Sequence, residues 1–188
     1  MFDEPAIRAA VASIIKAIGE DPGREGLVDT PRRVAEMYAE LFMGIGMSAK
    51  EELKVVYEAG HREMVILRDI PFYSMCEHHL LPFYGVAHIG YIPDVNGRIV
   101  GISKLARVLE IITKRPQIQE RMTSEIADAI MDGLKPSGVV VVVQAEHLCM
   151  IMRGIKKPGS HIVTSALRGT FHTHPETRTE FFSLLQGK

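Results

Sequence analysis

Apolar and polar positions in the first part of the chain alternate with the period of an α-helix. Over residues 6–18, apolar side chains recur every three or four positions, and a glycine follows. A second helix is predicted to begin at Thr30, whose hydroxyl would cap it, and to reach about Phe42. The pattern therefore predicts two regions, an N-terminal helical pair and a larger domain, over residues 1–45 and 46–188.

Beyond this pair, β-branched and aromatic runs alternate with amphipathic helical patterns. The runs predict strands over residues 64–67, 80–92, 98–101, 138–145, 149–152 and 161–167. The fourth run contains five consecutive valines, which predicts a strand buried on both faces. Helices are predicted to be capped by Ser103, to begin at Pro116, and to cover residues 176–185. Asn96 and Gly97 predict a tight hairpin between the second and third strands. Strands around a central helix pair indicate an α+β fold with a mostly antiparallel sheet.

The charge balance and the apolar runs argue against several classes of partner. A formal net charge of −1 provides no general basic surface for nucleic acid or for a membrane. No apolar run reaches the length of a transmembrane helix, and Arg8 and Lys16 interrupt the first helix, which therefore does not resemble a signal peptide. We expect a cytoplasmic protein in which any anionic ligand is bound by a local cluster of cations.

The only two cysteines of the chain each lie close to histidines. Zinc prefers thiolate and imidazole ligands, and a catalytic zinc site keeps one of four positions open. Cys76, His79 and Cys149 would supply three ligands and leave the fourth position free. His78 and His147 would then lie beside the metal, where imidazole is well suited to move protons near neutral pH. This pattern indicates metal-assisted hydrolysis.

Other interpretations of the cysteines are open. They could be buried and inert, or form a disulfide, although a reducing cytoplasm disfavours the bond. A closed structural zinc site usually shows paired CxxC motifs, which this chain lacks. A zinc deaminase would show HxE followed by PCxxC, and neither is present.

A group of cations is predicted at the start of the helix that follows residue 101. Ser103, Lys104 and Arg107 lie there, where free backbone N–H groups and the helix dipole favour a phosphate chain. Arg153 follows Cys149 by four positions and is a third candidate cation. The alternative is a solvated basic face of the helix.

Glu120 is a candidate for recognising a base. A carboxylate can accept two parallel N–H bonds from the N1–H and 2-amino edge of guanine, an edge that adenine does not present. The alternative is an acidic residue in the first turn of a helix, where it complements the helix dipole.

Four long segments carry a resemblance to a known family. They are CEHHLLPFYGVAHIGYIP, VGISKLARVLEIITKRPQIQERMT, AEHLCMIMRGIKKPGS and VTSALRGTF. Together with DTPRRVAEMY they closely resemble GTP cyclohydrolase I over residues 29–185. The resemblance implies the tunnelling fold (T-fold), in which an antiparallel sheet carries two helices on one face and is preceded by an N-terminal helical part.

The resemblance also implies roles for individual residues. The zinc ligands would be Cys76, His79 and Cys149. The catalytic acid–base histidines would be His78 and His147. The triphosphate ligands would be Ser103, Lys104, Arg107 and Arg153, with Arg32 as a contributor from a neighbouring subunit. The residues that recognise guanine would be Gln119 and Glu120.

The reaction and the assembly are likewise implied by the family. GTP and water would be converted to 7,8-dihydroneopterin triphosphate and formate, the first step of tetrahydrofolate and pterin biosynthesis. Subunits would join their sheets into pentameric barrels that stack as a homodecamer, with active sites where subunits meet. No role is predicted for five further histidines: His61, His88, His161, His172 and His174.

Two alternative functions are compatible with parts of this pattern. One is a different T-fold enzyme, such as a nitrile reductase of the queuosine pathway, which uses a nucleophilic cysteine without the zinc ligands. The other is a non-enzymatic protein that binds guanine nucleotides. Retention of both His78 and His147 argues against a protein that only binds, because binding needs no proton transfer.

Overall fold

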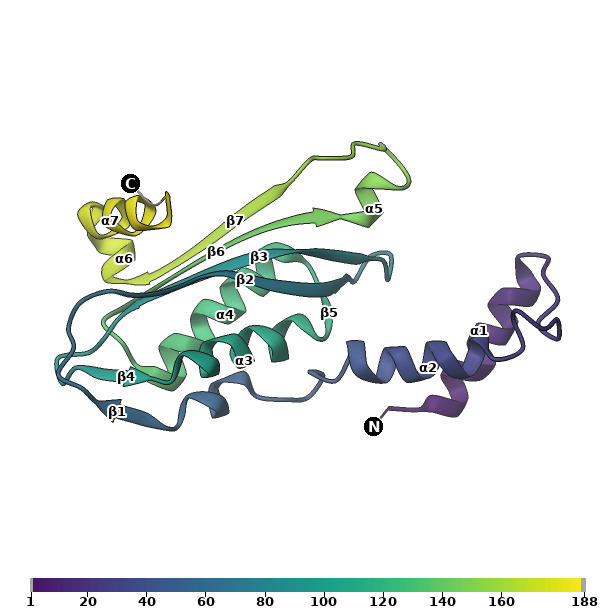
Figure 1. The fold of residues 1–188 in the computed structure, drawn as a ribbon, viewed down its shortest axis with the longest axis horizontal. Helices are drawn as coiled ribbons and strands as arrows, with labels where there is room; N and C mark the ends of the chain where they lie inside the picture. The colour runs from purple at the N-terminus through teal and green to yellow at the C-terminus, as the bar shows by residue number, and fades with distance from the viewer. Residues whose placement is uncertain (1, 187–188) are drawn as a thin grey trace. The chain divides into compact units, whose positions relative to one another are not determined.

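The structure, a computed structural model, describes residues 2–186 and has an α+β fold, as the sequence predicts (Figure 1). It divides into two compact units between Met43 and Gly44, and each unit is described by itself. Among the described residues, no helix is both long and apolar enough to cross a membrane.

The first unit is a pair of helices that pack against each other. They are α1 (Glu4–Ala17) and α2 (Thr30–Leu41). The side chain of Asp3 caps α1 by accepting a hydrogen bond from the backbone N–H of Ala6 at 3.0 Å. The predicted cap of α2 is wrong, because Thr30 is already helical and Asp29 occupies the N-cap position without a side-chain cap bond.

The second unit is built on a five-stranded sheet with the order β5-β2-β3-β6-β7 (Figure 1). Its strands are β2 (Val65–Cys76), β3 (Pro82–Ile92), β5 (Pro116–Gln117), β6 (Gly138–His147) and β7 (Ile162–Gly169). The four long strands are antiparallel, whereas β5 runs parallel to the end of β2, with Met75 opposite Pro116. The strand predicted over residues 64–67 is therefore much longer, and it leads directly to Cys76.

A separate two-stranded sheet replaces the predicted hairpin. It consists of β1 (Val56–Glu58) and β4 (Arg98–Val100), which are antiparallel. The predicted pairing of β4 with β3 is wrong because both edges of β3 are already occupied at this end. Tyr91 lies opposite Val65 of β2, and Ile92 lies opposite Gly138 of β6. The chain that leaves β3 must therefore find another partner strand.

Two long helices cover one face of the sheet, as Figure 1 shows. They are α3 (Ile102–Thr113) and α4 (Gln119–Leu134), and η1 (Ala49–Leu53) packs against both. The side chains that α3 and α4 bury in the core include Leu105, Val108, Leu109, Met122, Ile126 and Ile130. Apolar residues at helical spacing thus place these helices on the sheet.

The valine run of β6 contributes to both faces of the sheet. Val139, Val141 and Val143 join the core beneath α3 and α4, whereas Val140 and Val142 join a second cluster on the other face. That second cluster includes side chains from two C-terminal helices, α6 (Thr170–Thr173) and α7 (Pro175–Gln186). The prediction of a strand buried on both faces is confirmed.

Three further predictions about local structure are wrong, and each concerns a segment that carries or borders residues predicted for the site. Ser103 does not cap α3, because Gly101 holds the N-cap position. Pro116 does not begin a helix; it lies in β5, and α4 begins at Gln119. The strand predicted over residues 149–152 is instead a short helix, α5 (Leu148–Ile151).

Candidate metal centre and active site

The turn that follows β2 brings the first candidate ligands together. The carbonyl of Cys76 accepts hydrogen bonds from the N–H groups of His79 at 3.3 Å and Leu80 at 2.8 Å. The N–H of Cys76 donates to the carbonyl of Leu81 at 2.9 Å, and Leu80 takes a left-handed φ of 51°. The chain is thereby folded back on itself, so that His79 lies beside Cys76 at the end of the strand.

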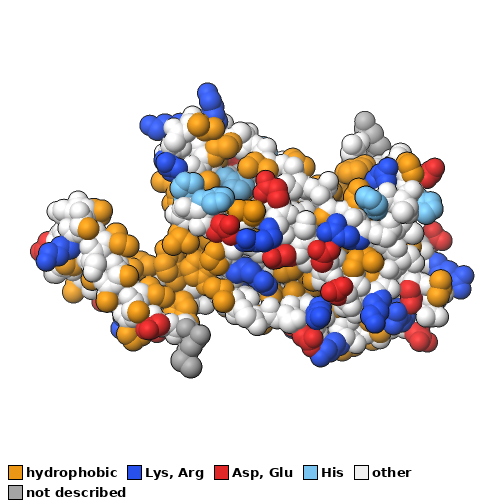
Figure 2. Space-filling model, turned by 180° about the vertical axis from the view of Figure 1, so that it is seen from behind, with side chains coloured by type: hydrophobic (Ala, Val, Ile, Leu, Met, Phe, Trp, Pro, Cys, Tyr) orange, Lys and Arg blue, Asp and Glu red, His pale blue; other side chains and the backbone are white. Residues whose placement is uncertain are grey.

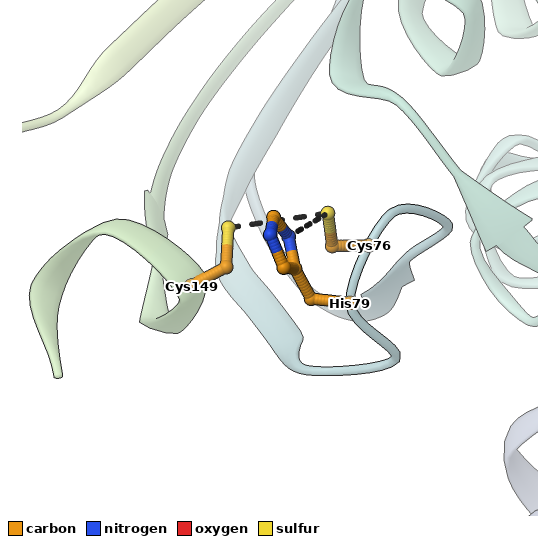
Figure 3. Close-up of side chains that lie close together, drawn as sticks. All are labelled: Cys76, His79 and Cys149. Atoms are coloured by element: carbon orange, nitrogen blue, oxygen red, sulfur yellow. Dashed lines mark hydrogen bonds between the residues drawn. The ribbon is translucent and has the colours of Figure 1, made fainter. Parts of the chain in front are cut away.

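Cys149 reaches the same place from another part of the chain. It lies in α5, directly after β6, and β6 pairs with β3 up to the register Phe83 opposite His147. Figure 3 shows the side chains of Cys76, His79 and Cys149 converging from the turn and from α5. Their ligand atoms all lie within 4.8 Å of one another.

The spacing of these atoms fits a zinc ion better than a disulfide. The Sγ atoms of Cys76 and Cys149 are 3.9 Å apart, and Cys76 Sγ lies 3.8 Å from His79 Nδ1. A disulfide would require about 2.05 Å, and both cysteines are free. Tetrahedral zinc with bonds of about 2.3 Å to sulfur and 2.0 Å to nitrogen would separate its ligand atoms by roughly 3.5–3.8 Å. The donor set and its geometry therefore suit this metal.

Metal binding at this group would be coupled to loss of the thiol protons. Burial, and then the neighbouring Cys76 sulfur, raise the pKa of the Cys149 thiol. Two thiolates this close would repel each other without a compensating charge. A bound cation would supply that charge and favour the deprotonated form that coordinates metal.

Two basic side chains flank the three candidate ligands. A guanidinium nitrogen of Arg153 lies 3.0 Å from Nε2 of His79, which leaves Nδ1 as the nitrogen of His79 that faces Cys76. Nδ1 of His78 also lies 3.8 Å from Cys76 Sγ, and the His78 side chain is exposed. His78 is therefore placed beside the group where it is open to solvent.

His147 lies at the end of β6, two residues before Cys149, and is buried. Its ring stacks on Phe83 with centroids 4.5 Å apart and an interplanar angle of 5°. Its Nε2 lies 2.8 Å from Oε1 of Gln119. Burial lowers the pKa of His147, and the charge of nearby Glu120 opposes that shift. A neutral imidazole near pH 7 follows, which can accept a proton.

Gln119 and Glu120 begin α4 but differ in their surroundings. The side chain of Gln119 is 1% exposed, and its amide nitrogen lies within hydrogen-bond distance of three oxygens. Glu120 is exposed and lies close enough to His147 to influence its pKa. Of the two residues predicted to recognise guanine, Glu120 is thus the one open to a ligand.

The predicted triphosphate ligands of α3 lie at the far end of that helix from the metal group. The carbonyl of Thr113, at the C-terminal end of α3, accepts a hydrogen bond from Ser74 at 2.7 Å, and Ser74 precedes Cys76 by two residues. Ser103 is the second residue of α3 and so lies at its other end. Ten residues of α-helix correspond to roughly 15 Å. A single chain therefore does not bring these residues to the metal group.

Three of the predicted phosphate-binding cations are paired with carboxylates. Lys104 Nζ lies 3.0 Å from Glu52 Oε2, and a guanidinium nitrogen of Arg107 lies 3.7 Å from the same atom. The hydrogen bond from Lys104 lowers the pKa of Glu52. Arg32, in the first unit, pairs with Glu36 at 2.9 Å. Figure 2 shows basic and acidic side chains interspersed over one face of the molecule, and histidines at two separate places on it.

Comparison with known proteins identifies the family. A sequence model of GTP cyclohydrolase I matches residues 7–186. The GTP cyclohydrolase 1 of Dehalococcoides mccartyi (strain CBDB1) is 70% identical over 188 residues, which is 100% of both chains. The GTP cyclohydrolase 1 of Thermoanaerobacter pseudethanolicus is 58% identical, again over 100% of both chains. The chain belongs to the GTP cyclohydrolase I family.

Membership in the GTP cyclohydrolase I family makes this chain an enzyme and implies GTP as its substrate. The resemblance recognised in the sequence is thereby confirmed. Among solved structures, the archaeosine synthase QueF-Like in the apo form has a TM-score of 0.42 and 17% identity. That match covers 56% of this chain and 93% of the other.

The structure adds residues to the GTP cyclohydrolase I site that sequence reasoning missed. A guanidinium nitrogen of Arg121 donates to Glu77 at 2.5 Å, and its Nε donates to Gln117 Oε1 at 3.0 Å. The N–H of Glu77 donates to the carbonyl of Gln117 at 3.1 Å. These bonds tie the turn after β2 to β5 and α4. No local sequence signal predicts a pair 44 positions apart. Phe83, stacked on His147, was missed for the same reason.

Proposed function

We propose that this chain catalyses the zinc-dependent conversion of GTP and water to 7,8-dihydroneopterin triphosphate and formate, the first step of tetrahydrofolate and pterin biosynthesis. The observation that carries the proposal is the convergence of Cys76, His79 and Cys149 into one group, with His78 beside it and His147 two residues before Cys149. Residues 46–188 would form the catalytic domain, and the helical region would precede it.

Cys76, His79 and Cys149 would hold the zinc ion. When bound, zinc supplies a Lewis acid that lowers the pKa of water to about 7, so that water can attack C8 of the purine at neutral pH. The carbon at C8 accepts this attack more readily once N7 is protonated. His147 would deliver that proton after its free ring nitrogen has taken one up from water, and the more exposed His78 would carry protons to and from solvent during ring opening.

The later steps of the reaction change the substrate's own rings and ribose. A further hydrolysis releases C8 as formate, and the ribose then rearranges to an aminoketone that closes onto the pyrimidine. No phosphate bond is broken, so the triphosphate acts as a binding handle. Its proposed ligands are Ser103, Lys104, Arg107 and Arg153, with Arg32 from a neighbouring subunit. The absence of a GxxxxGK[ST] motif in the sequence agrees with that role.

Glu120 would select guanine by accepting two hydrogen bonds from N1–H and the 2-amino group. It is exposed, and it lies at the start of α4 close to His147. A bound base would shield this carboxylate from water, and a shielded carboxylate without a partner is costly, which would disfavour adenine in the same place. The side chain of Gln119, predicted to share this role, is already bonded within the protein.

We further propose that the active site is completed by a second copy of the chain. The cations of α3 lie at the opposite end of that helix from the metal group, so one GTP would contact the two groups in different subunits. A T-fold homodecamer of two pentameric barrels, expected from the family, would provide such interfaces. The outer strand β7, and the part of β2 that the two-residue β5 does not pair with, leave edges that could pair between copies. The free thiols of Cys76 and Cys149 support a cytoplasmic location.

Incubation of the zinc-loaded protein with GTP tests this proposal. Formate should appear together with a pterin that becomes fluorescent after oxidation. Protein stripped of metal by a strong chelator should be inactive and should recover when zinc is added. Unchanged GTP with the zinc-loaded protein would defeat the proposal.

A further inference from the structure

The orientation of the Gln119 amide is dictated by its neighbours. Its nitrogen lies 3.1 Å from the carbonyl oxygen of Val143, 3.0 Å from that of Ile162 and 3.1 Å from Oγ1 of Thr164. Carbonyl oxygens only accept hydrogen bonds, so an NH2 group must face them. The amide oxygen therefore faces the opposite way, toward His147.

Two threonines give every bond in this group a direction. The hydroxyl of Thr123 donates to the backbone carbonyl of Gln119 at 2.7 Å, which uses its only proton. Thr123 must then accept from the hydroxyl of Thr164, which lies 2.7 Å away. Thr164 has in turn spent its proton and can accept from the Gln119 amide. The donations thus run one way, from the Gln119 amide through Thr164 and Thr123 to the Gln119 backbone carbonyl. This fixes the amide nitrogen as a donor and the side-chain oxygen, Oε1, as the acceptor.

His147 lies against that oxygen with little freedom to move. Its Nε2 is 2.8 Å from Gln119 Oε1, an atom that can only accept, so Nε2 carries a proton. The ring is also held flat against Phe83, with an interplanar angle of 5°. The two side chains are buried, at 1% exposure for Gln119 and 8% for His147.

We propose that Gln119 is a positioning residue for His147. Its side chain holds the tautomer with the proton on Nε2, which leaves Nδ1 as the nitrogen that exchanges protons with the substrate. Gln119 thus acts through His147, and its side chain does not bind guanine. This inference rests on the proposed acid–base role of His147.

A double-mutant cycle in the zinc-loaded enzyme tests the proposal. Gln119→Met has nearly the same volume but neither donor nor acceptor. We expect it to lower kcat by roughly 10- to 100-fold while the Kd for GTP changes by less than about 3-fold. In a His147→Ala background the same substitution should change kcat by less than about 2-fold, because the residue through which it acts is gone.

Different failures of this experiment are distinguishable. A rise in the Kd for GTP of about 10-fold or more in both backgrounds would mean that Gln119 binds guanine, and would overturn the positioning role. Equal losses of kcat in both backgrounds would overturn it as well, because Gln119 would then act independently of His147. Full activity of His147→Ala alone would instead refute the acid–base role of His147, and the positioning role with it.

A second variant distinguishes loss of the hydrogen bond to His147 from misfolding. Gln119→Glu, protonated in this buried site, keeps an oxygen that faces His147 Nε2 and a group that can donate to the carbonyls. We expect it to retain about 10-fold more kcat than Gln119→Met, with equal zinc content and oligomer mass. Equal kcat in the two variants would contradict the proposal. If Gln119→Met does not assemble, Gln119→Glu takes its place in the double-mutant cycle. Any loss of kcat in Gln119→Glu should then appear with His147 present and be less than about 2-fold in the His147→Ala background.

Discussion

At the scale of single residues, the two cysteines determine what this site can hold. Cys76 is fixed by the backbone bonds of its turn, and Cys149 arrives on a separate helix, yet their sulfurs lie 3.9 Å apart. Burial raises the pKa of Cys149, and a bound cation would favour the thiolate form that coordinates metal. The arrangement is therefore better suited to a metal than to inert packing.

Replacing Cys149 tests whether zinc binding can be lost while the protein still folds. We predict that Cys149→Ala loses stoichiometric zinc and activity but still folds, because the sheet and its core do not depend on this partly buried side chain. Metal analysis and circular dichroism would show this. Met152→Ala, an exposed position just after α5, serves as the matched control and should retain zinc. Stoichiometric zinc in Cys149→Ala would rule out the ligand role.

Replacing Glu120 separates substrate recognition from metal binding. We predict that Glu120→Ala raises the KM for GTP by about 10-fold or more, because two charge-assisted hydrogen bonds are lost, and leaves the zinc content unchanged. Steady-state kinetics and metal analysis would measure the two effects. Glu110→Ala, an exposed acid on α3, is a suitable control. An unchanged KM and turnover in Glu120→Ala would count against guanine recognition.

His88 now has a structural role that its sequence position did not reveal. Its Nδ1 accepts a hydrogen bond at 3.1 Å from the N–H of Asp69, which lies at a β-bulge between Leu67 and Ile70 with a φ of 58°. Burial lowers the pKa of His88 below its usual 6.5. The neutral ring thus stabilises the bulge as an acceptor.

This contact predicts a pH dependence of stability. Because the folded-state pKa of His88 is lowered, the unfolded chain binds its proton first as the pH falls below about 6.5. The free energy of unfolding should therefore be highest above that pH and decline as the pH falls through the folded pKa. His88→Asn, which offers an oxygen near the position of Nδ1, should show a shallower decline in denaturant titrations. The exposed His161→Asn is the control. An equal decline in all three proteins would refute the assignment.

At the scale of elements, the turn after β2 depends on its neighbours. Arg121 of α4 reaches Glu77, and β5 pairs with the end of β2, so the turn is held from two sides. Cys76 and His79 lie within the segment that these contacts restrain. The rigidity of the metal group thus depends on α4 as well as on the turn itself.

Loosening this restraint should speed the release of metal. We predict that Arg121→Met increases the rate at which a chelator removes zinc by roughly 3- to 10-fold, because the turn can open more often. Transfer of zinc to a coloured chelator would measure the rate. Arg168→Met breaks another ion pair of α4, with Asp128 at 2.6 Å, and is the matched control. Equal rates in the two variants would contradict the role of Arg121.

The sequence predicts elements whose neighbours repeat a clear pattern and fails where distant segments decide the structure. The valines of β6 and the helical spacing of α3 were sufficient to place those elements. The hairpin after β3 failed because β2 and β6, remote in sequence, already occupy both edges of that strand. Likewise, Cys76, His79 and Cys149 were predicted as a group from residue chemistry, whereas the contacts of Gln119 and Arg121 depend on tertiary packing.

At the scale of the whole molecule, the two ends of α3 carry different parts of the proposed site. The C-terminal end contacts β2 beside Cys76, and the N-terminal end carries Lys104 and Arg107. One chain holds these groups roughly a helix length apart. We therefore propose that one GTP contacts the two groups in different copies of the chain.

Mixed oligomers test this arrangement. Cys149→Ala and Lys104→Ala should each be nearly inactive alone. Co-expressed in equal amounts, they should recover about a quarter of the wild-type activity, because that share of interfaces pairs an intact metal group with an intact cation group. Activity of the purified mixture would be compared with that of each variant. No recovery in verified mixed oligomers would place both groups of one site in the same chain.

The central claim is that this chain uses zinc to remove C8 of GTP as formate without breaking the triphosphate. The most direct measurement is a reaction of zinc-loaded protein with GTP labelled with carbon-13 at C8, followed by NMR. We predict one labelled formate for each GTP consumed, a pterin product that keeps its triphosphate, and loss of both when zinc is chelated. Unchanged GTP, or release of phosphate in place of labelled formate, would contradict the claim.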